Sequence, residues 1–447
     1  MTPKGVEHDT REQYARYLMP VAARGVEPVV IVRGAGRTLT DADGRDYLDC
    51  FSGISVVNAG HNHPRIVAAA RAQMEQLVHC CSYVYHVPVV GQLADKLAAI
   101  APGDLTKSFF SNSGAEANEG ALRLAKQHTG RREVVALAYG FHGRTLGTLS
   151  ITGNSARKKN NGPYSPGVAF GPAPYCYRCP LGKEYPSCAV ACADELEKAI
   201  LAEGPDRVAF FIAEPVMGAG GVIPAPREYW TRIRQICDTY DVLMVADEVI
   251  TGAGRTGKMF ACEHWDVRPD IISCAKGISS GYLPLGAVIV HERIYKTLLD
   301  SPAGAAVWHG FTNTGNPACC AAGLKTLEIM ERDGVVEDAR KMGERLGQRL
   351  QELRSSPIVG EIRTLGLMAA VELVRDPRTR EAFPEALGVG ARFRDAAREQ
   401  GLLIRAVGDS VCMSPPLIIT AWEIDLMIEK LKATLAETES WLAAQKN

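Results

Sequence analysis

Short runs of apolar residues recur through the middle of the chain and alternate with stretches of helical periodicity. Apolar runs that are bounded by polar or glycine-rich segments are typical of strands whose two faces are both buried. Strands that alternate with helices predict a doubly wound α/β domain, with a large, mostly parallel sheet and a site beyond the carboxyl ends of its strands. The clearest predicted strands are EVVALAY (133–139), VAFFIAEP (208–215), VLMVADEV (242–249), IISCAK (271–276) and GAVIVH (286–291).

The C-terminal third has a different pattern, in which long amphipathic helices are separated by single strands. Helices are expected at 335–354, 387–400 and 421–445, and strands at 366–374 and 402–407. This order is typical of a smaller α+β domain. The strand-like segments before residue 60 are expected to pack beside it. We therefore predict an N-terminal segment (1–60), a large α/β domain (61–330) and a small α+β domain (331–447).

Composition and charge narrow the function classes. The 447 residues carry 50 Lys and Arg against 51 Asp and Glu, so the balance gives no electrostatic reason to expect nucleic acid or membrane binding. The polar N-terminus has no apolar signal region, and no apolar run approaches the roughly 18 residues of a membrane span. Thirteen scattered cysteines indicate reduced thiols and therefore a cytoplasmic enzyme.

Two predicted strands end in residues with distinctive chemistry. Lys276 follows a buried strand and begins a Gly/Ser-rich loop, and Asp247 lies near the end of another buried strand. A desolvated lysine has a lowered pKa and becomes a nucleophile. A lysine that forms a Schiff base, together with a carboxylate for a protonated ring nitrogen, is typical of pyridoxal phosphate enzymes. The alternative is a strand-end lysine that reaches solvent.

A small-residue turn precedes the helical pattern in FFSNSGAEANEGALRLAKQ (109–127). Free backbone N–H groups and the helix dipole at such a helix start bind anions. Ser113, Gly114 and Ala115 are therefore candidates for holding a phosphate. The same residues also fit an ordinary N-cap formed by Ser113, with Glu116 close behind.

The segment AYGFHGRTLG (138–147) follows another predicted strand and holds three candidate residues. Phe141 is placed to stack on a planar cofactor, and Arg144 to meet a carboxylate. His142 fits either a general base or, more simply, a histidine that orients a turn. The alternatives are that Phe141 is an ordinary core residue and that Arg144 is an ordinary solvated arginine.

GAGRTG (252–257) matches two nucleotide-binding patterns, one of them together with Lys258. A phosphate-binding P-loop needs Ser or Thr after the lysine, but this chain has Met259 there. The dinucleotide fingerprint should open a helix, which the following residues do not predict. A glycine-rich loop between two strands is the favoured interpretation, and a P-loop nucleotidase is the alternative.

Cys176, Cys179, Cys188 and Cys192 form a C-x2-C…C-x3-C pattern. Four thiolates with similar spacing bind zinc in other proteins. The middle spacing is short and the last pair falls at a predicted helix start, so free, packed thiols are favoured over a metal site. We predict no metal.

Together these segments resemble class III aminotransferases, which are pyridoxal 5'-phosphate enzymes of fold type I. The resemblance spans nearly the whole chain, because eight motifs follow one another in the family's order. They are NAGHNHP (58–64), SNSGAEAN (111–118), FHGRT (141–145), AEPVMGAGG (213–221), VADEVITGAGRTG (245–257), AKGISSGYLPLGA (275–287), HGFTNTGNP (309–317) and MSPPL (413–417).

The resemblance implies a role for each matching residue. Lys276 matches the Schiff-base lysine that also moves the proton, and Asp247 matches the partner of the ring nitrogen. Thr312 matches a threonine that reaches the phosphate from a partner subunit, which implies a homodimer with shared sites, possibly a tetramer. The remaining implied cofactor-binding residues are Ser113, Gly114, Ala115, Phe141, His142, Glu214 and Val249.

The residues that would recognise the substrate match two different branches of the family. Many relatives have a carboxylate-binding arginine where this chain has Cys412, so Glu214 needs a different partner, and Ile250 replaces a common glutamine. Arg405 instead matches the arginine of the ω-amino acid and amine:pyruvate branch. Arg144 matches a carboxylate-binding arginine of the 4-aminobutyrate and acetylornithine branches. Ile54 completes the predicted substrate-binding set.

The resemblance therefore implies a ping-pong aminotransferase. Its expected donor is an ω-amino acid or an amine, and its expected acceptor is a keto acid such as pyruvate or glyoxylate. The first alternative is a 4-aminobutyrate or acetylornithine aminotransferase that uses 2-oxoglutarate. A pyridoxal phosphate aminomutase, which needs no external acceptor, is a further alternative.

Overall fold

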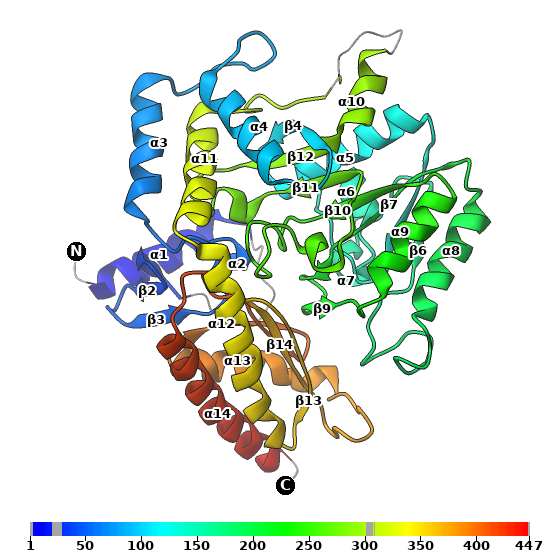
Figure 1. Ribbon diagram of the computed structural model, residues 1–447. Coiled ribbons are helices and arrows are strands. Elements are labelled where there is room, and N and C mark those ends of the chain that lie inside the picture. The colour runs from blue at the N-terminus through cyan, green and yellow to red at the C-terminus, as the bar shows by residue number, and fades with distance from the viewer. Residues whose placement is uncertain (1–2, 20–28, 301–306, 308, 446–447) are drawn as a thin grey trace.

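The computed structural model describes residues 3–19, 29–300, 307 and 309–445. A seven-stranded sheet of order β4–β12–β11–β10–β7–β5–β6 forms its centre (Figure 1). Strands β11, β10, β7, β5 and β6 pair in parallel, whereas β12 runs antiparallel to both β11 and β4. The predicted, mostly parallel sheet is confirmed. Its strands are β4 (Leu105–Ser111), β5 (Glu133–Leu137), β6 (Val168–Gly171), β7 (Val208–Ala213), β10 (Leu243–Asp247), β11 (Ile271–Cys274) and β12 (Gly286–His291).

Helices cover both faces of this sheet, as its doubly apolar strands require. In β5, Val134 and Ala136 pack in the apolar cluster that contains α5, whereas Val135 and Leu137 pack in the cluster of α8 and α9. This alternation follows from the two-residue period of a strand. The first face also carries α10, and the second also carries α4 and α11. These helices are α4 (Pro88–Ile100), α5 (Gly114–Thr129), α8 (Ala191–Glu203), α9 (Tyr229–Thr239), α10 (Glu292–Leu299) and α11 (Pro317–Arg332).

A second, antiparallel sheet of order β13–β14–β17–β16 is formed by the C-terminal third. The three expected helices are present close to their predicted bounds. Strand β17 is one element that the hydrophobic pattern did not predict. The elements of this part are α12 (Val335–Leu350), β13 (Val359–Leu365), β14 (Met368–Leu373), α13 (Val389–Glu399), β16 (Arg405–Val407), β17 (Ser410–Met413) and α14 (Ala421–Ala444).

The N-terminal strands lie against the C-terminal part of the chain (Figure 1). A four-stranded sheet of order β1–β2–β3–β15 joins them, because β15 pairs in parallel with β3. The expected packing of the N-terminal segment beside the C-terminal part is therefore observed, although the boundaries 1–60, 61–330 and 331–447 stay a prediction. The elements are α1 (Pro3–Tyr17), β1 (Ile31–Ala35), β2 (Thr38–Asp41), β3 (Asp46–Asp49) and β15 (Leu402–Leu403).

The remaining elements connect those described above. Within the described ranges, no helix combines the length and apolar content that a membrane crossing requires. The remaining elements are α2 (Ser52–Ser55), α3 (Pro64–Gln76), α6 (Leu146–Ile151), α7 (Ser155–Lys158), β8 (Val216–Met217), β9 (Ile223–Pro224), η1 (Ala261–Trp265), η2 (Lys276–Ile278), η3 (Gln351–Ser355) and η4 (Glu385–Leu387).

Candidate active site

The carboxyl ends of β10 and β11 bring Asp247 and Lys276 to one edge of the large sheet. Asp247 is the last residue of β10 and pairs in register with Ser273 of β11, and Lys276 begins η2 just beyond β11. Lys276 has a φ of 48°, a left-handed conformation that is uncommon for a residue with a side chain. Such backbone strain is concentrated at functional sites.

A pocket of about 260 Å³ lies at this edge. It collects nine of the residues that the sequence proposed for a cofactor or substrate. Asn118, Gly143 and Ile250 also line the pocket, although sequence reasoning had assigned none of them a binding role. The nine expected residues are Gly114, Ala115, Phe141, His142, Arg144, Glu214, Asp247, Val249 and Lys276.

Asp247 is buried, with 2% of its surface exposed, and both of its carboxylate oxygens accept hydrogen bonds. Oδ2 lies 2.8 Å from the donating Nδ2 of Asn118 and 2.7 Å from Nδ1 of His142. Oδ1 accepts the backbone N–H of Val249 at 3.1 Å. These hydrogen bonds fix the carboxylate in place. No Lys or Arg of the described residues forms an ion pair with Asp247, so its negative charge lacks a strong cationic partner.

Asn118 links Asp247 to the neighbouring elements. Its Nδ2 also donates to the backbone carbonyl of His142 at 2.8 Å, and its Oδ1 accepts from the hydroxyl of Ser273 at 2.5 Å. Asn118 lies on α5 and Ser273 on β11. The only sequence signal for Asn118 is its place in the SNSGAEAN motif, and the sequence offers none for Ser273.

Burial lowers the pKa of Lys276 to about 8, even though the negative charges of Glu214 and Asp247 act in the opposite direction. The side chain is half-buried and faces the pocket. A lysine with this pKa carries a substantial neutral fraction near neutral pH, and the neutral amine is the nucleophilic form. The expectation of a desolvated lysine is therefore supported over that of a solvent-exposed one.

Glu214 lies in the same pocket with its carboxylate held by the backbone. Its two oxygens accept the N–H groups of Phe141 at 3.0 Å and Gly218 at 2.9 Å. Burial, followed by the negative charge of Asp247, raises the pKa of Glu214 to about 7. Glu214 pairs with these two backbone groups in place of the arginine that other branches carry.

The Ser-Gly-Ala turn at the start of α5 contains an ordinary N-cap and also residues that line the pocket. Ser113 is an N-cap whose exposed hydroxyl accepts the N–H of Glu116 at 3.2 Å, and it does not line the pocket. Gly114 and Ala115 do line it, at the helix N-terminus where N–H groups are free to meet an anion. A Cβ on Gly114 would lie 2.6 Å from Cγ1 of Val249, so this close approach requires glycine.

Three other expected residues lie outside the lining of the pocket. Arg405 stacks on Phe51, with Cζ 5.6 Å from the ring centroid, and its charge acts on Lys276. Thr312 is exposed, and Ile54 is 53% exposed in the kinked α2. The structure therefore places Arg405 near the pocket, and it gives no contact between the other two and the nine clustered residues.

The glycine-rich loop 252–257 connects β10 to η1 and β11, as the favoured interpretation predicted. Arg255 is fully buried in it and donates to Oδ1 of Asn58 at 2.6 Å and to the carbonyl of Pro415. Burial lowers the pKa of Arg255 to about 9. These contacts tie the loop to the N- and C-terminal parts of the chain, which is a structural role and does not resemble phosphate binding.

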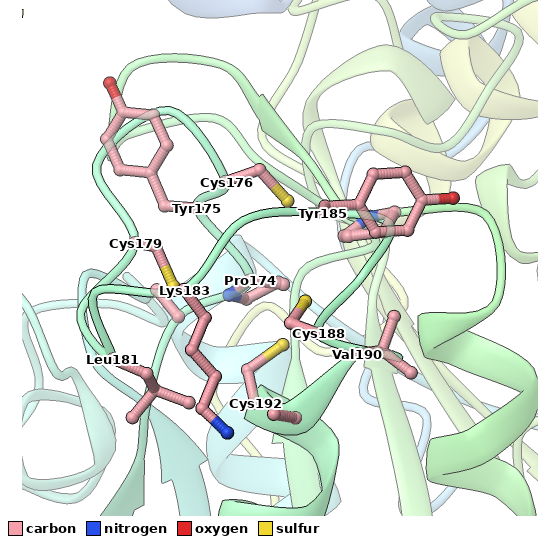
Figure 2. A pocket seen from close by; sticks show the side chains of 13 residues that line it. Pro174, Tyr175, Cys176, Cys179, Leu181, Lys183, Tyr185, Cys188, Val190 and Cys192 are labelled. Carbon is pink, nitrogen blue, oxygen red and sulfur yellow. The ribbon is translucent and has the colours of Figure 1, made fainter.

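All four cysteines of the segment 176–192 line a small cavity of about 20 Å³ (Figure 2). Each is a free thiol, and burial raises the pKa of Cys176 to about 11 and that of Cys192 to about 12. Among the described residues, no group of three or more His, Cys, Asp or Glu side chains is placed to hold a metal ion. The four thiols are free in this structure, and the absence of a metal here stays a prediction.

Comparisons with known proteins agree with this geometry. The model of the family described as aminotransferase class-III matches residues 21–435. A probable aminotransferase of Mycobacterium tuberculosis is 40% identical over 93% of this chain and 91% of its own length. A putrescine–pyruvate aminotransferase of Pseudomonas aeruginosa is 37% identical, with coverages of 93% and 92%.

Two further proteins bear on the substrate and on the fold. A gamma aminobutyrate transaminase of Solanum lycopersicum is 36% identical over 93% of this chain and 82% of its own length. The crystal structure of an (S)-enantioselective omega-transaminase from Thermomicrobium roseum superimposes with a TM-score of 0.92 at 37% identity. That match covers 97% of this chain and 98% of the other.

The pocket fits pyridoxal phosphate on its own chemistry. Asp247 is a buried carboxylate that no Lys or Arg of the described residues pairs with, which suits a protonated ring nitrogen. Lys276 supplies an amine of lowered pKa in the same pocket. The glycine at 114 keeps open a helix N-terminus that suits a phosphate. The donor set therefore matches the ring nitrogen, the aldehyde and the phosphate of this cofactor.

Proposed function

The chain belongs to the class III aminotransferase family, and from this premise we propose that it moves an amino group from an ω-amino acid or amine to a keto acid such as pyruvate or glyoxylate. It is a pyridoxal phosphate enzyme, as the members of this family are. The similarity to an omega-transaminase and to a putrescine–pyruvate aminotransferase supports this substrate class.

When bound, pyridoxal phosphate supplies an electron-withdrawing ring that stabilises negative charge at the substrate carbon bearing the amino group. The proposal rests above all on the placement of Lys276, whose pKa is about 8, in one pocket with Asp247. Nζ of Lys276 would hold the aldehyde carbon of the cofactor, and the freed amine would then move the proton of the substrate as a general base and acid.

The other pocket residues would hold and orient the cofactor. Asn118 and His142 fix Asp247, whose carboxylate would keep a positive charge on the ring nitrogen. Phe141 and Val249 line the pocket and would contact the two faces of the ring, and the N–H groups of Gly114 and Ala115 would bind the phosphate. Because these side chains are positioned before substrate arrives, little reorganisation is needed during the reaction.

We also propose a homodimer in which Thr312 completes the phosphate site of the partner subunit. Its exposed position in the turn 312–315 leaves it available to another chain. A cytoplasmic location is proposed because all thirteen cysteines are free thiols, which a reducing compartment maintains. The three-part division at residues 60 and 330 belongs to the same proposal.

Lys276→Ala tests the function directly. The wild-type holoenzyme should be yellow, should lose that absorbance when β-alanine or an amine is added, and should regain it with pyruvate. Lys276→Ala should show neither the spectral cycle nor turnover. Lys258→Ala is the matched control, because this exposed lysine completes the GAGRTGK pattern. If Lys258→Ala abolished activity while Lys276→Ala retained it, the proposal would fail in favour of a P-loop enzyme.

A second candidate is transfer to 2-oxoglutarate, as in 4-aminobutyrate aminotransferases. The position of Arg144 in the pocket favours it, as does the similarity to a gamma aminobutyrate transaminase. Pyruvate, glyoxylate and 2-oxoglutarate should be compared as acceptors in wild type, Arg405→Ala and Arg144→Ala. Unchanged keto acid reactivity in Arg405→Ala together with its loss in Arg144→Ala would select this second candidate. Turnover without any external acceptor would indicate an aminomutase.

A further inference from the structure

Arg157 lies beside the pocket, although neither the motifs nor the resemblance assign it a role. It belongs to α7, and its Cζ lies 5.9 Å from the centroid of the Phe141 ring. Phe141 itself lines the pocket that contains Lys276. The half-buried guanidinium of Arg157 is thus held against an aromatic side chain of the site.

Two other arginines act on Arg157. Burial lowers its pKa first, and the positive charges of Arg405 and Arg144 lower it further. Arg144 lines the pocket, and the charge of Arg405 reaches Lys276. Arg157 is held against Phe141 and Arg405 against Phe51, and the exposed Arg144 lines the pocket, so three guanidinium groups that influence one another lie around the Lys276 pocket.

None of these three arginines has an acidic partner among the described residues. Neither a hydrogen bond nor an ion pair joins the guanidinium of Arg144, Arg157 or Arg405 to any of the described Asp or Glu side chains. Buried arginines elsewhere have partners inside the protein: Arg363 binds Glu361 and Glu372, each at 2.5 Å, and Arg255 donates to Asn58 and to the carbonyl of Pro415. Neighbouring like charges without a counterion are unfavourable, and a bound anion would relieve them.

We propose that Arg157 is a substrate-binding residue that contacts the carboxylate of the keto acid or amino acid substrate, together with Arg405 and Arg144. This inference rests on the proposed function and deepens it, because it makes a carboxylate the feature that the site selects. Guanidinium groups bind carboxylates through paired N–H donors, so the three side chains offer more than one such pair. An amine without a carboxylate uses the same Lys276 but does not need these contacts.

Arg157→Gln tests the inference, with Arg157→Lys as the conservative variant. We expect Arg157→Gln to raise KM for pyruvate and β-alanine by roughly 10- to 100-fold, the loss expected for a hydrogen bond to a charged group, with little change in kcat. Arg157→Lys should fall between wild type and Arg157→Gln, since lysine keeps the charge without the paired donors. Lys159→Gln removes an exposed charge next to the same helix and should behave as wild type.

Two measurements separate carboxylate binding from a structural effect. The half-reaction of the holoenzyme with 1-phenylethylamine, which has no carboxylate, should be unchanged in Arg157→Gln. The Kd for propionate, an unreactive carboxylate, measured by isothermal titration, should rise by the same factor as the KM for pyruvate. Equal losses with 1-phenylethylamine and with β-alanine would overturn the inference, because they would indicate that Arg157 only supports Phe141.

The two proposals fail in different ways. If wild type reacted with no amine donor at all, the proposed function would be wrong. If wild type reacted normally and both Arg157 variants kept the wild-type KM for pyruvate and Kd for propionate, only the role of Arg157 would be wrong. An equal rise in KM in Lys159→Gln and Arg157→Gln would also overturn the role of Arg157, since the loss of any nearby positive charge would then have the same effect.

Discussion

Nδ1 of His142 lies 2.7 Å from Oδ2 of Asp247, and each of the two residues has only 2% of its surface exposed. Because a carboxylate oxygen accepts, His142 carries its proton on Nδ1. Its Nε2 is buried and has no hydrogen-bond partner within the described part of the chain. The imidazole therefore serves to orient Asp247, and this agrees with a positioning role more than with that of a general base.

Asp247→Asn should preserve the fold and remove most of the activity. The amide is nearly isosteric with the carboxylate and keeps a carbonyl oxygen for Asn118 or His142, but it has no negative charge for the ring nitrogen. We expect kcat to fall on the order of 10²- to 10³-fold, the loss typical for removal of an electrostatic contact in a closed site. Stopped-flow absorbance of the amine half-reaction measures it. A kcat within about twofold of wild type would contradict the role of Asp247.

Gly114→Ala should weaken cofactor binding through Val249. The new Cβ would lie 2.6 Å from Cγ1 and 2.8 Å from Cγ2 of Val249, so the valine has to move. Overpacking of this kind costs about 1–3 kcal/mol, which corresponds to a roughly 5- to 150-fold weaker Kd for the cofactor if the strain falls on the bound state. Fluorescence titration of the apoprotein measures this Kd.

Gly91→Ala is the matched control for that substitution. Gly91 is an exposed residue of α4, and no atom lies within 4 Å of a Cβ built on it. Alanine is favoured over glycine in a helix by about 1 kcal/mol, so this variant should bind the cofactor as wild type does and be slightly more stable. Equal cofactor affinity in both variants would show that the contact with Val249 does not matter.

Much of the large sheet could be predicted because its strands are apolar on both faces. The antiparallel direction of β12 was not predicted, yet the chain contains a reason for it. Residues 275–285 between β11 and β12 hold only the short η2, whereas a parallel connection needs a crossover of a dozen or more residues. Strand β17 was missed because SVCM (410–413) is only four residues long, and it pairs with distant β14 as well as with neighbouring β16.

Site residues could be predicted from the sequence where their type and motif indicate their role. Residues whose role depends on contacts with distant parts of the chain could not. Lys276 and Asp247 follow apolar strands whose carboxyl ends must meet at one edge of the sheet. The hydrogen bonds of Asn118 to Asp247 and Ser273 join residues 129 and 155 positions apart, so no local spacing indicates them. Arg157 was missed for the same reason, since its charged neighbours belong to other segments.

Glu214 should make stability depend on pH in an unusual direction. Burial and the charge of Asp247 raise its pKa from 4.5 to about 7 in the folded protein. The folded state then binds this proton more tightly than the unfolded state, so the stabilisation is complete below pH 4.5 and is lost as the pH rises through about 7. A difference of this size amounts to about 3 kcal/mol.

Glu214→Gln removes this titration and leaves the other ionisable groups in place. The Tm of the variant should therefore improve relative to that of wild type as the pH rises from about 5 to about 8. Glutamine loses one of the two bonds from Phe141 and Gly218, which lowers Tm by an amount that does not depend on pH. Thermal unfolding at several pH values measures the difference, and a constant difference in Tm would contradict the raised pKa.

Arg363→Met should destabilise the junction between the large sheet and the C-terminal sheet. Arg363 is 6% exposed and donates to Glu372 at 2.5 Å, to the hydroxyl of Tyr175 at 3.0 Å and to the carbonyl of Val222 at 2.9 Å. Among the residues that the structure describes, its loss leaves the buried charge of Glu372 with Arg178 as the one remaining ionic partner. Breaking a buried pair in this way costs about 3–5 kcal/mol.

The double variant Arg363→Met/Glu372→Gln separates the charge from the packing. In the single variant, the charge of Glu372 stays buried after it has lost its partner Arg363. Replacing Glu372 by glutamine removes this charge, so the double variant should recover part of the lost stability. Urea unfolding followed by circular dichroism measures both variants against wild type and Glu372→Gln. Strictly additive losses would mean that Arg363 acts through its contacts with Tyr175 and Val222, and that its pairing with Glu372 contributes little.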